Sequence, residues 1–372
     1  MMESYFRLKA GRERFQPWKN DGISALPLLL QKYDDRELFY IGLESKSLWS
    51  TVETIVKRDF ELPEFLINQL PPIDQSTSGR LFARLPSETK LELVYHVNIR
   101  DMTALCQSCK FFWREGTKVM ERFMKRCFDT MGLDWGSIRF AIRHMRSILS
   151  GAVVRQLAFL ESQPFNIDEF QFLEVRTMHT EYVVKYFETA TEYKTDEQYV
   201  SPSNVTVLHR PHHPSAFRIM IYETHESPQC SVFYQKSTAS FLWLDADGFV
   251  APYASLTFDR KTLIAYPIND KSLEAEIQRA RAHNIKIIPF HGEGGDCGTA
   301  ATCPSIVRNT LDTSCFNERF LSPVWSYRRV ARNEKTEVVW CLGSAGCRDG
   351  LRGRFFVKEF FSLSDNQGDI GV

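Results

Sequence analysis

Three amphipathic stretches follow one another between residues 85 and 128, and they constrain the fold of this chain more than any other feature. Leu85-Pro86 opens the first stretch, and proline suits a helix start because its missing N–H has no partner there anyway. A second helix is expected to begin at Asp101. Apolar residues recur every three or four positions in the second and third stretches, at Met102, Leu105, Cys106 and Cys109 and then at Met120, Phe123, Met124 and Cys127. This spacing predicts a compact unit of three packed helices.

The same stretch resembles an F-box. The matching residues are Leu85, Pro86, Glu88, Glu92, Leu93, Val94, Val97, Asp101, Met102, Leu105, Cys109, Phe112 and Trp113. Thr89 and Lys90 depart from the pattern, since F-boxes usually carry apolar residues there. The resemblance implies docking to an Skp-type linker protein of a cullin–RING ubiquitin ligase, through Leu85, Pro86, Leu93, Val97, Leu105, Cys109 and Trp113. An ordinary packing unit remains the alternative, because amphipathic spacing arises easily.

Composition excludes several other classes of protein. The chain has 372 residues, of which 43% are hydrophobic, so a substantial core is expected. The formal net charge is zero, and no basic excess points to nucleic acid or to an anionic membrane as the partner. No apolar run approaches the ~18 residues that a membrane-spanning helix needs. The nine cysteines are an odd, scattered set, and reduced thiols in the cytoplasm or nucleus are the simplest interpretation.

The order of expected helices and strands along the chain predicts an α+β fold, in which a short helical F-box-like module precedes a mixed α/β domain. The predicted segments are 1–78, of unknown role and ending in a polar linker, 79–128 for the helical module, 129–330 for the α/β domain and 331–372 for a last strand and tail. Helices are expected at 23–43, 137–149 and 271–283. Strands are expected at 217–222, 249–257, 263–266, 285–289 and within 330–342.

Residues 148–175 resemble the opening of a nucleotidyltransferase fold. In that family a Ser-Gly pair starts a helix that lies against the triphosphate, and Ser150-Gly151 matches it. The next strand then supplies alternate carboxylates, which point the same way and hold two divalent metals. Asp168 matches the first of these acids, but Phe170 stands where the second is needed.

A third acid belongs on a later strand in that family, and the expected strand offers Arg218, Met220 and Tyr222 instead. We therefore interpret the α/β region as a catalytically dead outline, without cofactor or metal, that recognises an unknown protein target. The enzymatic alternative is a divergent nucleotidyltransferase that uses Asp168 with Glu169 or Glu223.

A further resemblance is to a group of fungal proteins of unassigned function. It rests on the order of F-box-like helices, then Ser-Gly and Asp, then a phrase between residues 234 and 257. The corresponding positions in this chain are Tyr234, Gln235, Lys236, Ser237, Thr238, Ser240, Phe241, Tyr253, Ala254, Leu256 and Thr257. The departures are Gln235-Lys236, Leu242 and Ala254.

Several other groups have simple structural interpretations. Cys106 and Cys109 lie on an apolar helix face and are expected to be buried thiols. A cysteine-rich loop with His291, Cys297, Cys303 and Cys315 fits no common zinc spacing, although structural zinc stays an alternative. His209, His212 and His213 are expected in an exposed loop. Arg139, Arg143 and Arg146 are expected to form a solvated helix face.

Overall fold

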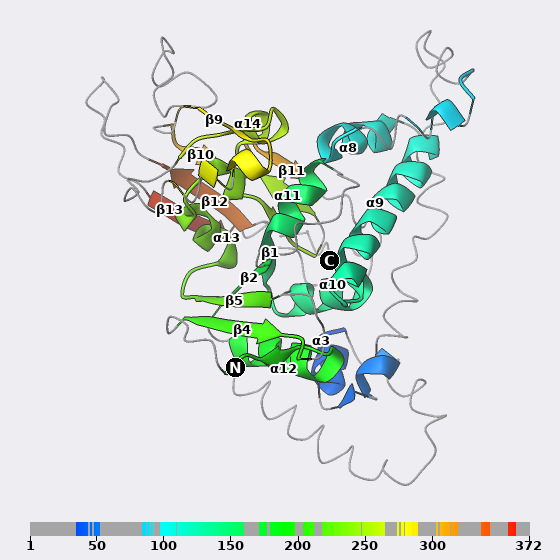
Figure 1. The fold of residues 1–372 in the computed structure, drawn as a ribbon, viewed down its shortest axis with the longest axis vertical. Coiled ribbons are helices and arrows are strands. Elements are labelled where there is room, and N and C mark those ends of the chain that lie inside the picture. The colour runs from blue at the N-terminus through cyan, green and yellow to red at the C-terminus, as the bar shows by residue number, and fades with distance from the viewer. Residues whose placement is uncertain are drawn as a thin grey trace, which may run out of the picture.

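The computed structural model describes residues 35–52, 84–159, 171–264, 274–288, 303–318, 336–342 and 356–361, with short gaps inside several of these ranges. Helices and strands both contribute extensively, so the predicted α+β class is confirmed. Figure 1 shows a central sheet with long helices along one side and a smaller sheet on the other.

The central sheet has eight strands in the order β11-β7-β6-β1-β2-β5-β4-β3. Strands β2 and β5 run parallel, whereas the other neighbouring pairs are antiparallel. The strand bounds are β1 (Ile148–Gly151), β2 (Gln171–Arg176), β3 (Lys194–Thr195), β4 (Val205–His209), β5 (Arg218–Thr224), β6 (Trp243–Leu244), β7 (Phe249–Ala251) and β11 (Phe316–Glu318). The predicted strand at 217–222 is therefore confirmed as β5.

The middle strands of this sheet are buried on both faces. Consecutive residues of a strand point to opposite faces, and here neighbours such as Ile148 and Leu149 belong to two different hydrophobic clusters. Trp243 and Leu244 divide between the same two clusters in the same way. An uninterrupted apolar run, rather than an alternating one, is typical of a strand that is covered twice.

Helices cover one face of the sheet. Their bounds are α3 (Asp35–Gly42), α8 (Ile99–Ser108), α9 (Lys110–Thr130), α10 (Trp135–His144), α11 (Ala152–Phe159) and α12 (Thr180–Ala190). The first hydrophobic cluster contains residues from all six helices and from the sheet, including Phe39, Met124, Phe128 and Met131. One continuous core thus includes part of the predicted segment 1–78 and residues on both sides of the predicted boundary at 128–129.

The other face is covered by a second cluster, centred on Trp340 and Phe233, whose rings stack with centroids 4.6 Å apart. Its elements include a three-stranded sheet of β10 (Arg308–Asn309), β12 (Thr336–Cys341) and β13 (Phe356–Phe361), with α13 (Pro228–Ser231) and α14 (Ala254–Phe258). Short strands β8 (Lys261–Thr262) and β9 (Lys286–Ile287) pair in parallel beside it.

The helix expected at 137–149 and the strand expected at 249–257 are wrong in their extent. The helix expected at 137–149 is α10, which begins at Trp135 because Asp134 Oδ1 accepts a hydrogen bond from Ser137 N–H at 2.9 Å. It ends before Arg146, whose φ of 48° turns the chain into β1. The strand expected at 249–257 stops at Ala251, because Pro252 cannot donate to the ladder, and α14 follows.

The predicted solvated arginine face is also wrong at Arg139. This side chain is buried and its Nε donates to the Ala246 carbonyl at 2.6 Å. The contact joins α10 to the β6–β7 turn. Arg146 is exposed, as expected.

Helices α8 and α9 approach closely at Gly116. A Cβ on this residue would collide with Cys106 Sγ and lie 3.0 Å from Met102 Sδ. The predicted apolar face of α9 is confirmed, since Met120, Met124 and Cys127 are buried and Phe123 packs against the same core. The two helices therefore form a tightly packed pair.

Candidate functional site

The candidate docking surface is built on α8, and Asn98 fixes where this helix begins. Asn98 Oδ1 accepts a hydrogen bond from Asp101 N–H at 2.9 Å, and Asn98 Nδ2 donates to Asp101 Oδ2 at 3.0 Å. Asparagine is among the best N-cap residues because its side chain satisfies a free helical N–H. The helix thus begins at Ile99 rather than at the predicted Asp101, which lies in the first turn.

The inner face of α8 is committed to the protein's own core. Ile99, Met102 and Cys106 are buried in the first cluster, and α8 packs against α9 and α11. Thr103 is also buried, but its hydroxyl donates to the Ile99 carbonyl at 2.8 Å. The prediction that Cys106 is a buried thiol is confirmed, while Cys109 lies outside the described residues. This face leaves nothing for a partner to contact.

The outer edge of α8 is more open. Val97 and Leu105 are half-buried and pack against the margin of the core, whereas Ala104 is exposed. Further back in the motif, Leu85 is half-buried and Pro86 is exposed. Leu93 and Cys109 lie outside the described residues, and Trp113 belongs to α9, with nothing described of its side chain. Four of the seven predicted docking residues therefore keep some solvent-accessible surface.

The two positions that depart from the F-box pattern differ from each other. Residues 88–90 are helical, and Lys90 N–H donates to the Pro86 carbonyl at 3.1 Å, as expected for a helix that starts at the proline. Thr89 is exposed, but Lys90 is buried, with 7% of its surface accessible. Position 90 therefore faces inward, which is where the motif usually has an apolar residue.

The nucleotidyltransferase-like segment has the predicted connection between Ser150-Gly151 and a helix. Gly151 ends β1 with a φ of 93°, a conformation that favours glycine, and α11 begins at the next residue. Ser150 is buried, and its hydroxyl has no hydrogen-bond partner within the described ranges. Asp168, Glu169 and Phe170 lie outside the described residues.

Strand β5 carries no carboxylate on the face that would need one. The register places Phe172 beside Met220, and Met220 shares its face of β5 with Arg218 and Tyr222. Glu223, the proposed substitute acid, lies on the opposite face with Ile219 and Ile221, which belong to the helix-covered core. Alternation along β5 thus places Glu223 on the face opposite to Met220 and Tyr222.

Three titratable or charged side chains meet at the β3–β4–β5 end of the sheet. The Asp196 carboxylate lies 3.8 Å from His209 Nδ1 and 3.8 Å from an Arg218 guanidinium nitrogen. His209 belongs to β4 and is half-buried, so the predicted exposed loop is wrong at this residue. His212 and His213 lie outside the described residues.

The serine and threonine residues between positions 237 and 262 have a structural role. Thr238 Oγ1 accepts a hydrogen bond from Leu263 N–H at 3.0 Å, and Thr262 Oγ1 accepts one from Ala239 N–H at 3.0 Å. The two hydroxyls lie 3.2 Å apart, and both side chains are buried. These contacts fasten the short helical turn at 238–240 to β8.

The cysteines that the structure describes are free thiols. Burial raises the pKa of both the Cys127 and Cys315 thiols to about 12, which leaves them protonated and poorly nucleophilic. Among the described residues, no group of three or more metal-binding side chains comes together. Cys303 is buried and Cys315 is half-buried, whereas His291 and Cys297 of the predicted loop lie outside these residues. No helix in the described part of the chain is long and apolar enough to cross a membrane.

Comparison with known proteins gives no match: no family model, curated protein or solved structure matches this chain.

Sequence reasoning missed two residues that shape the candidate site. Asn98 could have been found as a capping residue three positions before Asp101. Ala104 could not, because its exposure depends on which face of α8 the core covers.

Proposed function

We propose that the chain is a non-enzymatic, F-box-like adaptor. Residues 85–113 would dock an Skp-type linker of a cullin–RING ubiquitin ligase, and the α/β region would recognise a protein target. The observation that carries the proposal is the divided surface of α8. Its inner face is sealed by α9 and α11, while Val97, Leu105 and the exposed Pro86 retain apolar surface at the edge of the motif. A few residues usually supply most of the binding energy of a protein interface, and the proposal assigns that part to these side chains.

The proposal includes a cytoplasmic or nuclear location, in keeping with the scattered cysteines, and no nucleic-acid, membrane or cofactor partner. A pull-down of the linker protein by the full chain tests it. Wild type should retain the linker, and a Leu93→Asp, Leu105→Asp double variant should lose it. Equal retention by both, or none by wild type, would overturn the docking proposal.

Leu105 also packs against the core, so loss of binding by that variant needs a folding control. Circular dichroism and the urea midpoint of the double variant should stay close to those of wild type. If they do not, Ala104→Arg replaces it, because Ala104 is exposed and a large charged side chain there blocks docking without disturbing the core.

A divergent nucleotidyltransferase is the second candidate, and one observation favours it. Strand β1 ends at Gly151, α11 begins at the next residue and β2 follows it, in the order that the resemblance implies. Against it stands the position of Glu223 on the wrong face of β5. Isothermal titration of the full chain with ATP and magnesium decides this alternative: measurable heat that Ser150→Ala and Asp168→Asn both reduce would support it. No heat would end it.

A plain interaction protein, in which the helices at 85–128 only pack, is the remaining alternative. It differs from the adaptor in one measurable respect, which is that the linker protein would not bind the wild-type chain. A buried inner face of α8 is expected for both the adaptor and the plain interaction protein. Only binding at the outer edge of the motif distinguishes the two proposals.

A further inference from the structure

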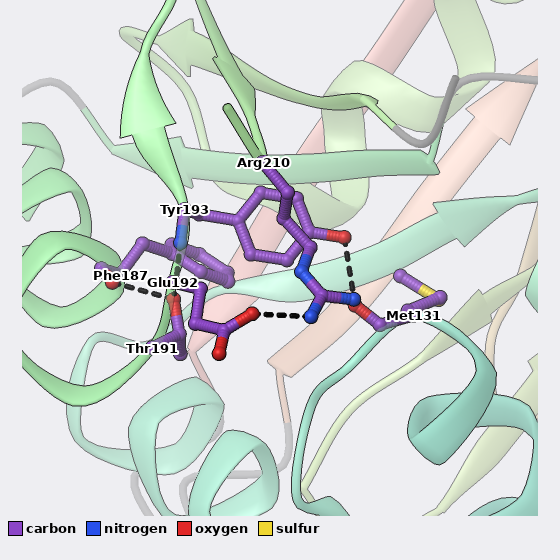
Figure 2. A network of polar contacts seen from close by, with 6 residues as sticks. All are labelled: Met131, Phe187, Thr191, Glu192, Tyr193 and Arg210. Carbon is purple, nitrogen blue, oxygen red and sulfur yellow. Dashed lines mark hydrogen bonds and ion pairs between the residues drawn. The ribbon is translucent and has the colours of Figure 1, made fainter. Parts of the chain in front are cut away.

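We infer that the turn between α9 and α10 is a rigid joint, fastened to the corner where α12 leads into β3 and β4. Figure 2 shows the contacts that make it. Tyr193 is fully buried, and its phenol O–H donates to the Met131 carbonyl at 2.9 Å. This bond joins residues 62 positions apart in sequence, so it holds together two parts of the fold rather than one local turn.

Arg210 supplies the second fastening. Its guanidinium pairs with the Glu192 carboxylate and lies against Gly132. A Cβ at position 132 would collide with this guanidinium, and the φ of +68° at Gly132 is itself strained for other residues. Glycine at position 132 therefore leaves the space through which the Arg210 guanidinium reaches Glu192.

The corner that receives these contacts is itself held in place. Thr191 Oγ1 donates to the Phe187 carbonyl at the end of α12 and accepts a hydrogen bond from Tyr193 N–H at 3.1 Å. Tyr193 is thus fixed through its backbone as well as its hydroxyl. Burial raises the pKa of this phenol, and the nearby charge of Arg210 opposes the rise, so the hydroxyl stays a donor at neutral pH.

The joint matters because of where α9 lies. This helix has 21 residues and spans about 30 Å, with the joint at one end and α8 at the other, as Figure 1 shows. At the α8 end, Arg100 lies over the Phe258 ring of α14, 5.9 Å from its centroid. Helix α9 is thus fastened at the joint and packs against α8 and α11, and these contacts together keep it in one direction relative to the sheet. The joint therefore fixes the direction of α8 relative to the sheet. The further step, that this direction orients a docked linker protein, rests on the proposed function.

The test uses the full chain without any partner. Spin labels on genetically encoded non-natural residues at Ala104 and Glu197, both exposed, leave the native cysteines untouched. Wild type should give one narrow distance distribution by double electron–electron resonance. Tyr193→Phe together with Arg210→Ala should broaden it, while the control Lys118→Ala, which breaks the exposed ion pair with Glu115 on α9, should not.

Hydrogen exchange gives a second readout at the joint itself. The amides of Gly132 and Leu133 donate to the Asp129 and Phe128 carbonyls at the end of α9. Their exchange should rise about fivefold in Tyr193→Phe, which loses one hydrogen bond and little packing. If the double variant unfolds, this single variant still decides the question. A broad distribution in wild type, or unchanged exchange in Tyr193→Phe, would overturn the joint. If wild type gives the narrow distance distribution and Tyr193→Phe gives the faster exchange, but wild type does not bind the linker protein, only the proposed function fails.

Discussion

The middle of the sheet and the α8 helix differ in how many of their faces the protein uses itself. Strands β1, β6 and β7 have a hydrophobic cluster on each side, and all of their apolar side chains belong to one of the two clusters. Helix α8 has one committed face and one open edge. Both faces of the sheet centre are therefore covered by the protein's own core, whereas α8 keeps surface that folding does not require.

The largest expected effect lies in the sheet centre. Trp243→Ala and Phe249→Ala each remove a buried ring, one from each cluster, and each should lower the free energy of unfolding by about 3–5 kcal/mol. Urea denaturation measures this loss. If only one of the two variants is strongly destabilised, the sheet is not covered equally on both faces, and the comparison fails.

A smaller effect is expected where α8 meets α9. Gly116→Ala introduces a methyl group against Cys106 and Met102, and overpacking of this kind should cost about 1–3 kcal/mol. Adding Cys106→Ala makes room, so the two substitutions together should cost less than the sum of their separate effects. A double-mutant cycle with no coupling would show that the helices do not touch at this point.

Alkaline pH should lower the free energy of unfolding, because the Cys127 thiol is buried in the helical part of the core. Burial raises the Cys127 pKa from an ordinary 9.0 to about 12, with Arg126 opposing the shift. The unfolded chain therefore loses this proton first as the pH rises, the folded chain binds more protons, and the free energy of unfolding falls. The stabilisation that the protonated thiol contributes is fully present below pH 9. The free energy of unfolding should then fall by about 1 kcal/mol between pH 9 and pH 10.

Denaturation midpoints of wild type and Cys127→Ala between pH 7 and pH 10 check this prediction. Burial also raises the Tyr253 pKa to about 12, so a residual alkaline decline is expected in the variant. A wild-type slope that Cys127→Ala leaves unchanged would contradict the burial of this thiol.

The smallest effect on stability belongs to the open edge. Ala104→Arg replaces an exposed residue in the middle of α8 and should change the free energy of unfolding by less than about 0.5 kcal/mol. Thermal and urea unfolding measure it. A loss comparable to that of Gly116→Ala would mean that this edge is packed, and the contrast between the two regions would disappear.

The sequence predicts the helices well because their signal is local. The spacing of Met120, Phe123, Met124 and Cys127 repeats within one element, and the structure buries that face. It predicts the start of α8 less well, since the side chain of Asn98 rather than the apolar pattern decides it. Only the residues near each end of a helix carry that information.

Features that depend on distant contacts could not be predicted from the sequence. The buried Arg139 needs the Ala246 carbonyl, which lies 107 positions away. Alternation along β5 already separates Glu223 from Tyr222, but which of the two faces the helices cover depends on contacts with distant elements. The candidate site was predicted as a set of residues, but which of them stay accessible depends on the packing of α9 and α11.

Isothermal titration of the full chain with a purified Skp-type linker tests the central claim most directly. Wild type and Glu181→Arg, an exposed change on the distant α12, should bind with the same Kd, and Ala104→Arg should weaken binding about tenfold or more. No binding by wild type, or equal binding by Ala104→Arg, would contradict the account.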